Sequence, residues 1–330
     1  MQLPRVGPRA FLRLSQASLA LVVLNIVSGA AVRLTDSGLG CPDWPTCAGR
    51  SLTPALSFHP AVEFGNRMVV VAVTVLLAVT LLAALRRSPV RRDLVWLSGA
   101  LVVGVVGEAV LGGIVVYTKL NPYAVMSHFV LGMALLTVAV QLALRAGRAA
   151  GPGRALVDPL GRRAATLFLG LLALAIAAGT ATTGAGPHAG GKGAVRLPVP
   201  LDDMARTHSS IVVVAVVVLL AELALLYRAG APEAVQERGR LLLAALAAQG
   251  VIGYSQFFLH LPALLVGIHV LGATVVWSAA LWFADGLRAR AAEEAAVVRS
   301  SSPADDTVLA AGADPGVVTA AAEQPALSGR

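Results

Sequence analysis

Residues 68–85 read Met68-Val-Val-Val-Ala-Val-Thr-Val-Leu-Leu-Ala-Val-Thr-Leu-Leu-Ala-Ala-Leu85, a run without a charged side chain. A run of about 20 apolar residues is long enough to cross the hydrocarbon core of a bilayer as a helix. Lipid offers the backbone no hydrogen bonds, so a spanning segment must satisfy its own amides, and a helix does so. We predict eight spans of this kind, at roughly 15–35, 65–85, 94–116, 125–144, 164–183, 208–227, 241–259 and 263–285.

The composition of the whole chain agrees with these runs. Of its 330 residues, 57% are hydrophobic and only 13% are charged, and the mean hydropathy is +0.76. These values exclude a soluble globular domain. The sequence therefore predicts an all-α polytopic membrane protein.

The distribution of basic residues predicts the orientation. Only seven of the 26 Lys and Arg residues fall on one side of the predicted spans. By the positive-inside rule, the other side, which holds both termini, faces the cytoplasm. The net charge of +8 then reflects a cytoplasmic membrane and its anionic lipid, and we expect no nucleic-acid partner. The seven are Arg33, Arg50, Arg67, Lys119, Lys192, Arg196 and Arg206.

The two cysteines of the chain, Cys41 and Cys47, lie in the first outer loop. The outer side of the membrane is oxidising, which favours disulfides. Two isolated cysteines close in sequence therefore predict a disulfide rather than free thiols. A metal site would need further ligands from elsewhere.

An internal repeat divides the chain. Glu108–Gly112 matches Gln249–Gly253 at an offset of 141 residues, and the same offset relates His128 to His269. Each half has four spans, so we predict two tandem four-helix bundles related by pseudo-two-fold symmetry about the membrane normal. The predicted parts are a half at 1–144, a cytoplasmic linker at 145–163, a half at 164–287 and a disordered cytoplasmic tail at 288–330.

Each half presents a pair of nitrogen-bearing side chains near the outer ends of its second and fourth spans. Asn66 and His128 are 62 residues apart, and His208 and His269 are 61 residues apart. A lone histidine is usually structural. Two imidazoles at one depth on different spans are instead a natural axial pair for a haem iron. The repeat therefore favours His208 and His269 as ligands.

The other polar residues of the spans and outer loops allow simpler readings. Arg33, Arg67 and Arg206 are placed to bind haem propionates, or equally to reach lipid headgroups. Glu63 can form a salt bridge with Arg67 one helical turn on. Glu108 and Gln249 lie within spans, where polar packing contacts explain them as well as a function does. We expect His59, His188 and His260 to be solvated or interfacial histidines, and Glu222 and Asp285 to be solvated cytoplasmic carboxylates.

Several of these motifs occur in an order that resembles the haem A synthase family, of an actinobacterial type. The resemblance covers residues 15–285, and its most specific parts are the first outer loop and one glycine-rich turn. The motifs are Val32–Cys47, Glu63–Arg67, Gly112–Gly113, Thr118–Lys119, His128, Gly184–Gly190, His208 and His269.

The resemblance implies an oxidoreductase that converts a methyl group of haem O to the formyl group of haem A by successive hydroxylations. His208 and His269 would hold a haem B cofactor in the C-terminal half. The N-terminal half would receive haem O beside Asn66, Arg67 and His128, with Glu63 as the catalytic carboxylate. The implied partners are haem O and haem A, membrane lipid, the haem O synthase (a farnesyltransferase) and cytochrome oxidase assembly factors.

Asn66 departs from the family pattern, in which many members carry a histidine. His128 would then be the direct protein ligand of the substrate iron, with Asn66 as a hydrogen-bond donor on the other side. Whether the substrate haem is five- or six-coordinate stays open. Two other functions fit parts of the pattern: a dihaem cytochrome for quinol-linked electron transfer, and a repeat-built transporter, which would place its polar residues nearer the midplane.

Overall fold

The computed structural model describes residues 5–289 except 50, 52, 55 and 152. Within this part of the chain, eight helices are long and apolar enough to cross a membrane. The chain is thus a multi-pass, all-α membrane protein, as predicted. The helices are α1 Pro8–Leu34, α2 Phe58–Arg86, α3 Arg92–Tyr117, α4 Pro122–Ala146, α5 Pro159–Ala185, α6 Leu201–Arg228, α7 Glu233–Phe258 and α8 Ala263–Gly286.

Most helices begin several residues before the predicted spans, because their ends project beyond the apolar run. Their starts carry recognisable signals. Asn121 caps α4 by accepting the Tyr123 N–H (3.0 Å), and Asp158 caps α5 by accepting the Gly161 N–H (2.8 Å). A proline follows each cap, where its missing N–H costs nothing. As a result, side chains predicted at the entrance of a span lie inside a helix.

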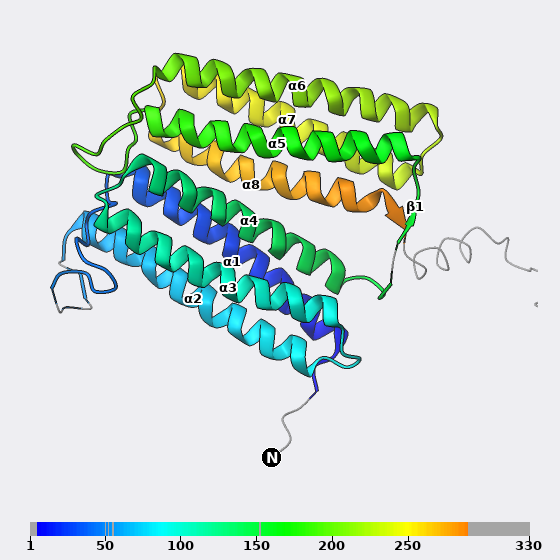
Figure 1. The fold of residues 1–330 in the computed structure, drawn as a ribbon, viewed down its shortest axis with the longest axis horizontal. Coiled ribbons are helices and arrows are strands. Elements are labelled where there is room, and N and C mark those ends of the chain that lie inside the picture. Colours follow the sequence, from blue (N-terminus) through cyan, green and yellow to red (C-terminus); the bar gives the residue numbers. More distant parts are fainter. Residues whose placement is uncertain (1–4, 50, 52, 55, 152, 290–330) are drawn as a thin grey trace, which may run out of the picture. The chain divides into compact units, whose positions relative to one another are not determined.

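The helices form two groups with the same set of neighbours (Figure 1). In the first group α1 contacts α2 and α4, and α3 contacts the same two helices; α5 to α8 repeat this set of contacts. Between the groups, α1 and α4 pack against α8, and α4 also packs against α5. Trp277 of α8 donates its indole N–H to Thr137 of α4 (2.8 Å) across this boundary. The symmetry axis between the groups stays a prediction.

Each group has its own buried apolar core, while other large apolar side chains point outward. Phe11 belongs to the first core, and Phe168 and Phe283 belong to the second. Trp96 and Leu264 are among the exposed ones, at 78% and 75%. Such exposure is unfavourable in water but expected where lipid is the solvent.

The turns after α3 and α7 have the same backbone. Lys119 and Leu120 adopt left-handed φ angles of 52° and 64°, and His260 and Leu261 adopt 62° and 60°. The Leu120 N–H bonds to the Val115 carbonyl (2.9 Å), as the Leu261 N–H bonds to Gln256 (2.7 Å). These turns are related by the 141-residue offset, so the repeat extends to local conformation. His260 is therefore part of the turn that follows α7.

The predicted linker at 145–163 contacts the end of helix α8 and the residues that follow it. Strand β1 (Arg154–Ala155) pairs antiparallel with strand β2 (Arg288–Ala289). An ion pair joins Arg148 to Asp285. The expectation of a solvated carboxylate at Asp285 is therefore wrong. The rest of the predicted tail lies outside the described residues.

Glu222 is a second carboxylate for which that expectation is wrong. Its side chain is fully buried, because it shares one helix face with the core residues Leu219 and Leu226. Neither carboxylate oxygen has a hydrogen-bond partner among the described residues.

Candidate functional site

The structure brings His208 of α6 and His269 of α8 together, as the repeat predicted. Their ring centroids are 6.4 Å apart, and the ring planes are inclined by 76°. Each ring lies about two helical turns after the first residue of its helix. The two imidazoles are therefore neighbours within the second group of helices.

Neighbouring backbone groups orient these rings and make room for them. His208 donates its Nδ1–H to the Ala175 carbonyl of α5 (2.8 Å), which leaves Nε2 as the lone-pair nitrogen. A Cβ atom at Gly179 would lie 3.2 Å from the His208 ring, and one at Gly253 would lie 3.1 Å from the His269 ring. Both glycines permit a close approach that a larger residue would obstruct.

The spacing of the two rings suits a shared haem iron. Two imidazoles on one metal, each with a metal–nitrogen bond of about 2 Å, have centroids about 6 Å apart. The observed 6.4 Å agrees with this value. No group of three or more His, Cys, Asp or Glu residues that could hold a metal ion occurs among the described residues.

The first group of helices presents a different set. His128 of α4 keeps 36% of its side chain accessible, and its Nδ1 lies 3.3 Å from Oε2 of the buried Glu108 on α3. Asn66 of α2 accepts a hydrogen bond from Ser28 of α1 on its Oδ1 (2.7 Å). The amide nitrogen of Asn66 keeps its donor hydrogens. At the paired positions on its second and fourth helices, this half thus offers one amide and one imidazole where the other half offers two imidazoles.

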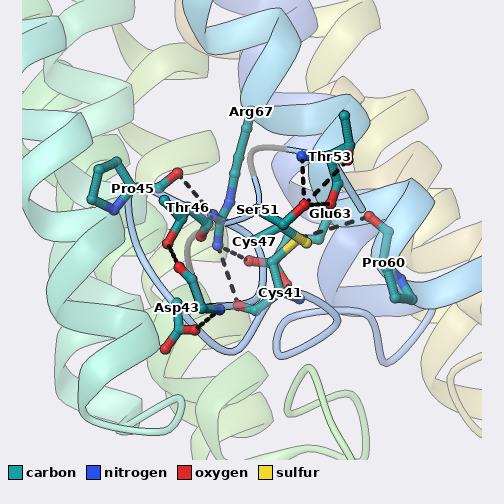
Figure 2. The surroundings of a disulfide bond; sticks show 11 residues. Cys41, Asp43, Pro45, Thr46, Cys47, Ser51, Thr53, Pro60, Glu63 and Arg67 are labelled. Atoms are coloured by element: carbon teal, nitrogen blue, oxygen red, sulfur yellow. Dashed lines mark hydrogen bonds and ion pairs between the residues drawn. A yellow bond between two sulfur atoms is a disulfide. The ribbon is translucent and has the colours of Figure 1, made fainter. Parts of the chain in front are cut away.

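Figure 2 shows how Glu63 joins helix α2 to the loop between α1 and α2. Its Oε2 accepts the backbone N–H of Cys41 (2.7 Å), and its Oε1 accepts a guanidinium hydrogen of Arg67 (2.6 Å). The expected salt bridge between Glu63 and Arg67 is present. Arg67 also donates to the loop carbonyls of Thr46 (2.8 Å) and Cys41 (3.3 Å). Both side chains therefore hold the loop as well as each other.

The same loop contains the predicted disulfide between Cys41 and Cys47 (Figure 2). It folds over the end of α3, where Trp44 lies against Gly113, whose Cβ would come 3.1 Å from the indole. Tyr117 donates its hydroxyl hydrogen to the Trp44 carbonyl (2.6 Å). Trp44 and Tyr117 thus fasten the loop to α3.

The three arginines predicted to meet propionates have different surroundings. Arg33 is half-buried and donates to the Thr183 carbonyl of α5. Arg67 is engaged as described above, and Arg206 is exposed on α6. Among the outer histidines, His59 contacts the Ser37 hydroxyl (3.0 Å) and His188 contacts the Leu261 carbonyl (2.8 Å).

Three contacts of the candidate sites do not follow from residue patterns: the Ser28 bond to Asn66, the Ala175 bond to His208 and the approach of Glu108 to His128. For Glu108 one signal exists in the sequence, since the repeat pairs it with Gln249. A carboxylate in one half against an amide in the other is a difference that packing alone does not require.

Comparison with known sequences adds a family. The family described as "Cytochrome oxidase assembly protein" (COX15-CtaA) matches residues 13–59 and 55–190 of this chain, which is more than half of its length.

Curated relatives match a shorter part. Proteins named "Heme A synthase" from Geobacillus kaustophilus, Geobacillus thermodenitrificans and Shewanella oneidensis are 34%, 33% and 30% identical over 131, 142 and 149 residues. These alignments cover 38%, 41% and 40% of this chain. They span 40%, 44% and 44% of the relatives' own lengths.

Proposed function

Because the chain belongs to the COX15-CtaA family of cytochrome oxidase assembly proteins, we propose that it is an oxidoreductase that converts haem O to haem A. The observation that carries the proposal, besides the family, is the close pair of His208 and His269 in one half, where the corresponding positions of the other half hold Asn66 and His128. An electron-transfer protein with two equivalent haems does not need this difference. A substrate site with an open iron position does.

In this proposal the C-terminal half holds haem B through His208 and His269. The ring spacing, the fixed tautomer of His208 and the two glycines support this assignment. The haem supplies redox chemistry, and the protein contributes the orientation and separation of the rings.

The N-terminal half would bind haem O as the substrate. His128 would be the iron ligand. Asn66, on the neighbouring helix α2, would direct its amide N–H toward the haem. Arg67 would lie at the outer boundary near the propionates. Because Arg67 already donates to Glu63 and to loop carbonyls, its role toward haem would be shared with loop anchoring.

Glu63 would move protons during oxidation of the haem O methyl group. A carboxylate can give and take a proton in place, which general acid–base catalysis requires. Its position within α2 near the outer end supports this role, and its bonds to Cys41 and Arg67 would hold it in one rotamer. The site would operate in the cytoplasmic membrane with both termini in the cytoplasm, as the distribution of Lys and Arg suggests.

The test is pigment analysis of a bacterial host that makes haem O but no haem A. Cells expressing the chain should contain haem A after acid extraction and chromatography, and cells with an empty vector should not. The purified protein should carry haem B with haem O or haem A. Haem B alone would favour the dihaem cytochrome, and a protein without haem would rule out both functions.

A further inference from the structure

We propose that Glu108 is a positioning residue for the iron ligand of the N-terminal half. Its carboxylate accepts the Nδ1–H of His128, directs Nε2 toward the haem O iron and makes this imidazole a stronger electron donor. The inference rests on the proposed function, because it assumes that His128 binds the substrate iron.

The first observation is the pairing of two buried polar atoms. Oε2 of Glu108 lies 3.3 Å from Nδ1 of His128. The second carboxylate oxygen and Nδ1 itself both lack a hydrogen bond among the described residues. A buried polar group without a partner destabilises the fold. A small rotation of the imidazole would form the bond, as often happens when a ligand completes a site.

The position of Glu108 supports a functional role. An acidic side chain within a membrane span is expensive and usually faces a partner or a functional site. Glu108 is 5% exposed and lies well inside α3, away from the helix ends. Of the ion pairs among the described residues, the one with His128 is the only one that includes Glu108. His128 is therefore the partner that explains a carboxylate at this place.

The other half shows what a neutral side chain does at the corresponding position. Gln249 donates its Nε2–H to the backbone carbonyl of His269 (2.8 Å), so the hydrogen bond reaches the main chain. In both halves a glycine of the partner helix lies against the long side chain. A Cβ at Gly132 would lie 3.7 Å from Glu108 Oε2, and one at Gly272 would lie 2.0 Å from Gln249 Oε1.

The difference between carboxylate and amide follows the difference in iron ligands. A carboxylate hydrogen-bonded to a metal-bound histidine fixes the ring and raises its basicity. The half with Gln249 has two imidazoles and needs no further donation. The half with Glu108 has Asn66 in place of the second imidazole, so its single ligand must donate more strongly. Glu108 therefore belongs with Asn66 as a feature of an open iron position.

The test is resonance Raman spectroscopy of the purified full-length protein loaded with haem O and reduced. A five-coordinate ferrous haem shows an iron–histidine stretch, whereas a bis-histidine low-spin haem does not, so the signal reports only the N-terminal site. Glu108→Gln should move this stretch to lower frequency and raise the midpoint potential of the same haem. Its affinity for haem O should fall about 10- to 100-fold.

Gln249→Glu is the matched control, since it makes the reverse change in the other half and should leave the stretch unmoved. Retention of the low-spin haem B spectrum shows that a variant has folded. If Glu108→Gln loses this spectrum, Glu108→Asp replaces it. The shorter carboxylate should also lower the stretch.

Wild-type frequency and wild-type haem O affinity in the folded Glu108 variant would overturn the inference and leave the proposed function standing. If the wild-type protein itself gave no iron–histidine stretch with haem O, the assignment of His128 as the substrate ligand would fail first, and the role of Glu108 would fail with it.

Discussion

Glu63 holds the loop between α1 and α2 and is also the proposed proton carrier of the site. Its two oxygens hold the outer loop through Cys41 and the guanidinium of Arg67. The same carboxylate is the candidate proton carrier of the site. A substitution that separates the two tasks must keep the loop contact and remove the acid–base function.

We expect Glu63→Gln to retain the fold and haem B but to lose haem A formation. The amide oxygen can still accept the Cys41 N–H, whereas an amide cannot exchange a proton as a carboxylate does. Cells carrying the variant should accumulate haem O or a hydroxymethyl form, as measured by chromatography of extracted pigments.

The control is Glu233→Gln, which removes an exposed ion pair with Arg240. It should change neither haem A formation nor haem B content. Haem A formation at the wild-type rate in Glu63→Gln would leave only the loop-holding role.

His208 and His269 give the second prediction at this scale. Replacing either by Ala should abolish the low-spin haem B spectrum, because the iron then loses one of two strong-field ligands. The reduced-minus-oxidised absorption spectrum of the purified protein measures this loss. His188→Ala should keep the spectrum, since the hydrogen bond of His188 goes to the turn at Leu261. Low-spin spectra in both Ala variants would refute the assignment.

At the level of elements, α7 and α8 approach closely where Gly253 lies against the His269 ring. We expect Gly253→Ala to lower the haem B content or broaden its spectrum, because a Cβ would come 3.1 Å from the imidazole. Gly250→Ala, on the same helix with nothing within 4 Å of the new Cβ, should leave the haem unchanged. Equal haem content in the two variants would contradict the packing argument.

The outer loop between α1 and α2 is held by a disulfide and by side chains of α2. In the chain-entropy view, closing so short a loop contributes about 2 kcal/mol. Cys41 and Cys47 should resist alkylation in protein isolated without reductant. Cys47→Ser should make the loop more sensitive to protease while the helices stay intact. Full alkylation of both thiols before reduction would count against the bond in cells.

On the scale of the whole molecule, the two groups of helices share neighbours and turn geometry but differ in their polar side chains. Matching turns after α3 and α7 keep the histidine-bearing helices in similar places. The halves differ at two pairs of corresponding positions. The N-terminal half has Asn66 and Glu108 where the C-terminal half has His208 and Gln249. The common frame is what the predicted repeat leads us to expect, and the polar differences suit the separate tasks that we propose for the two sites.

The orientation in the membrane is a prediction for the intact chain. A protease-cleavable tag at either terminus should be protected in intact spheroplasts and cut after lysis, because most Lys and Arg residues lie on the side of the termini. A tag inserted in the outer loop near Ser51 should be cut both in intact spheroplasts and after lysis. The reverse pattern would overturn the proposed orientation and move the candidate sites to the cytoplasmic side.

Sequence by itself determined the eight spans and the disulfide pair. Spans follow from local composition, because lipid requires every apolar run to satisfy its own backbone. With two cysteines, only one intramolecular pairing exists. The repeat also identified the histidines that would meet, since equal offsets in a duplicated bundle place residues at equal depths.

Only the tertiary structure decided which side chains touch. These contacts depend on the rotation of each helix about its axis. They are the 6.4 Å separation of the His208 and His269 rings, the hydrogen bond from the Cys41 N–H to Glu63, and the approach of Glu108 to His128. Rotation is set by the packing of many side chains from several helices, including small ones such as Gly253. For the same reason Glu222, which composition places at a solvated helix end, is buried: neighbours distant in sequence determine what covers it.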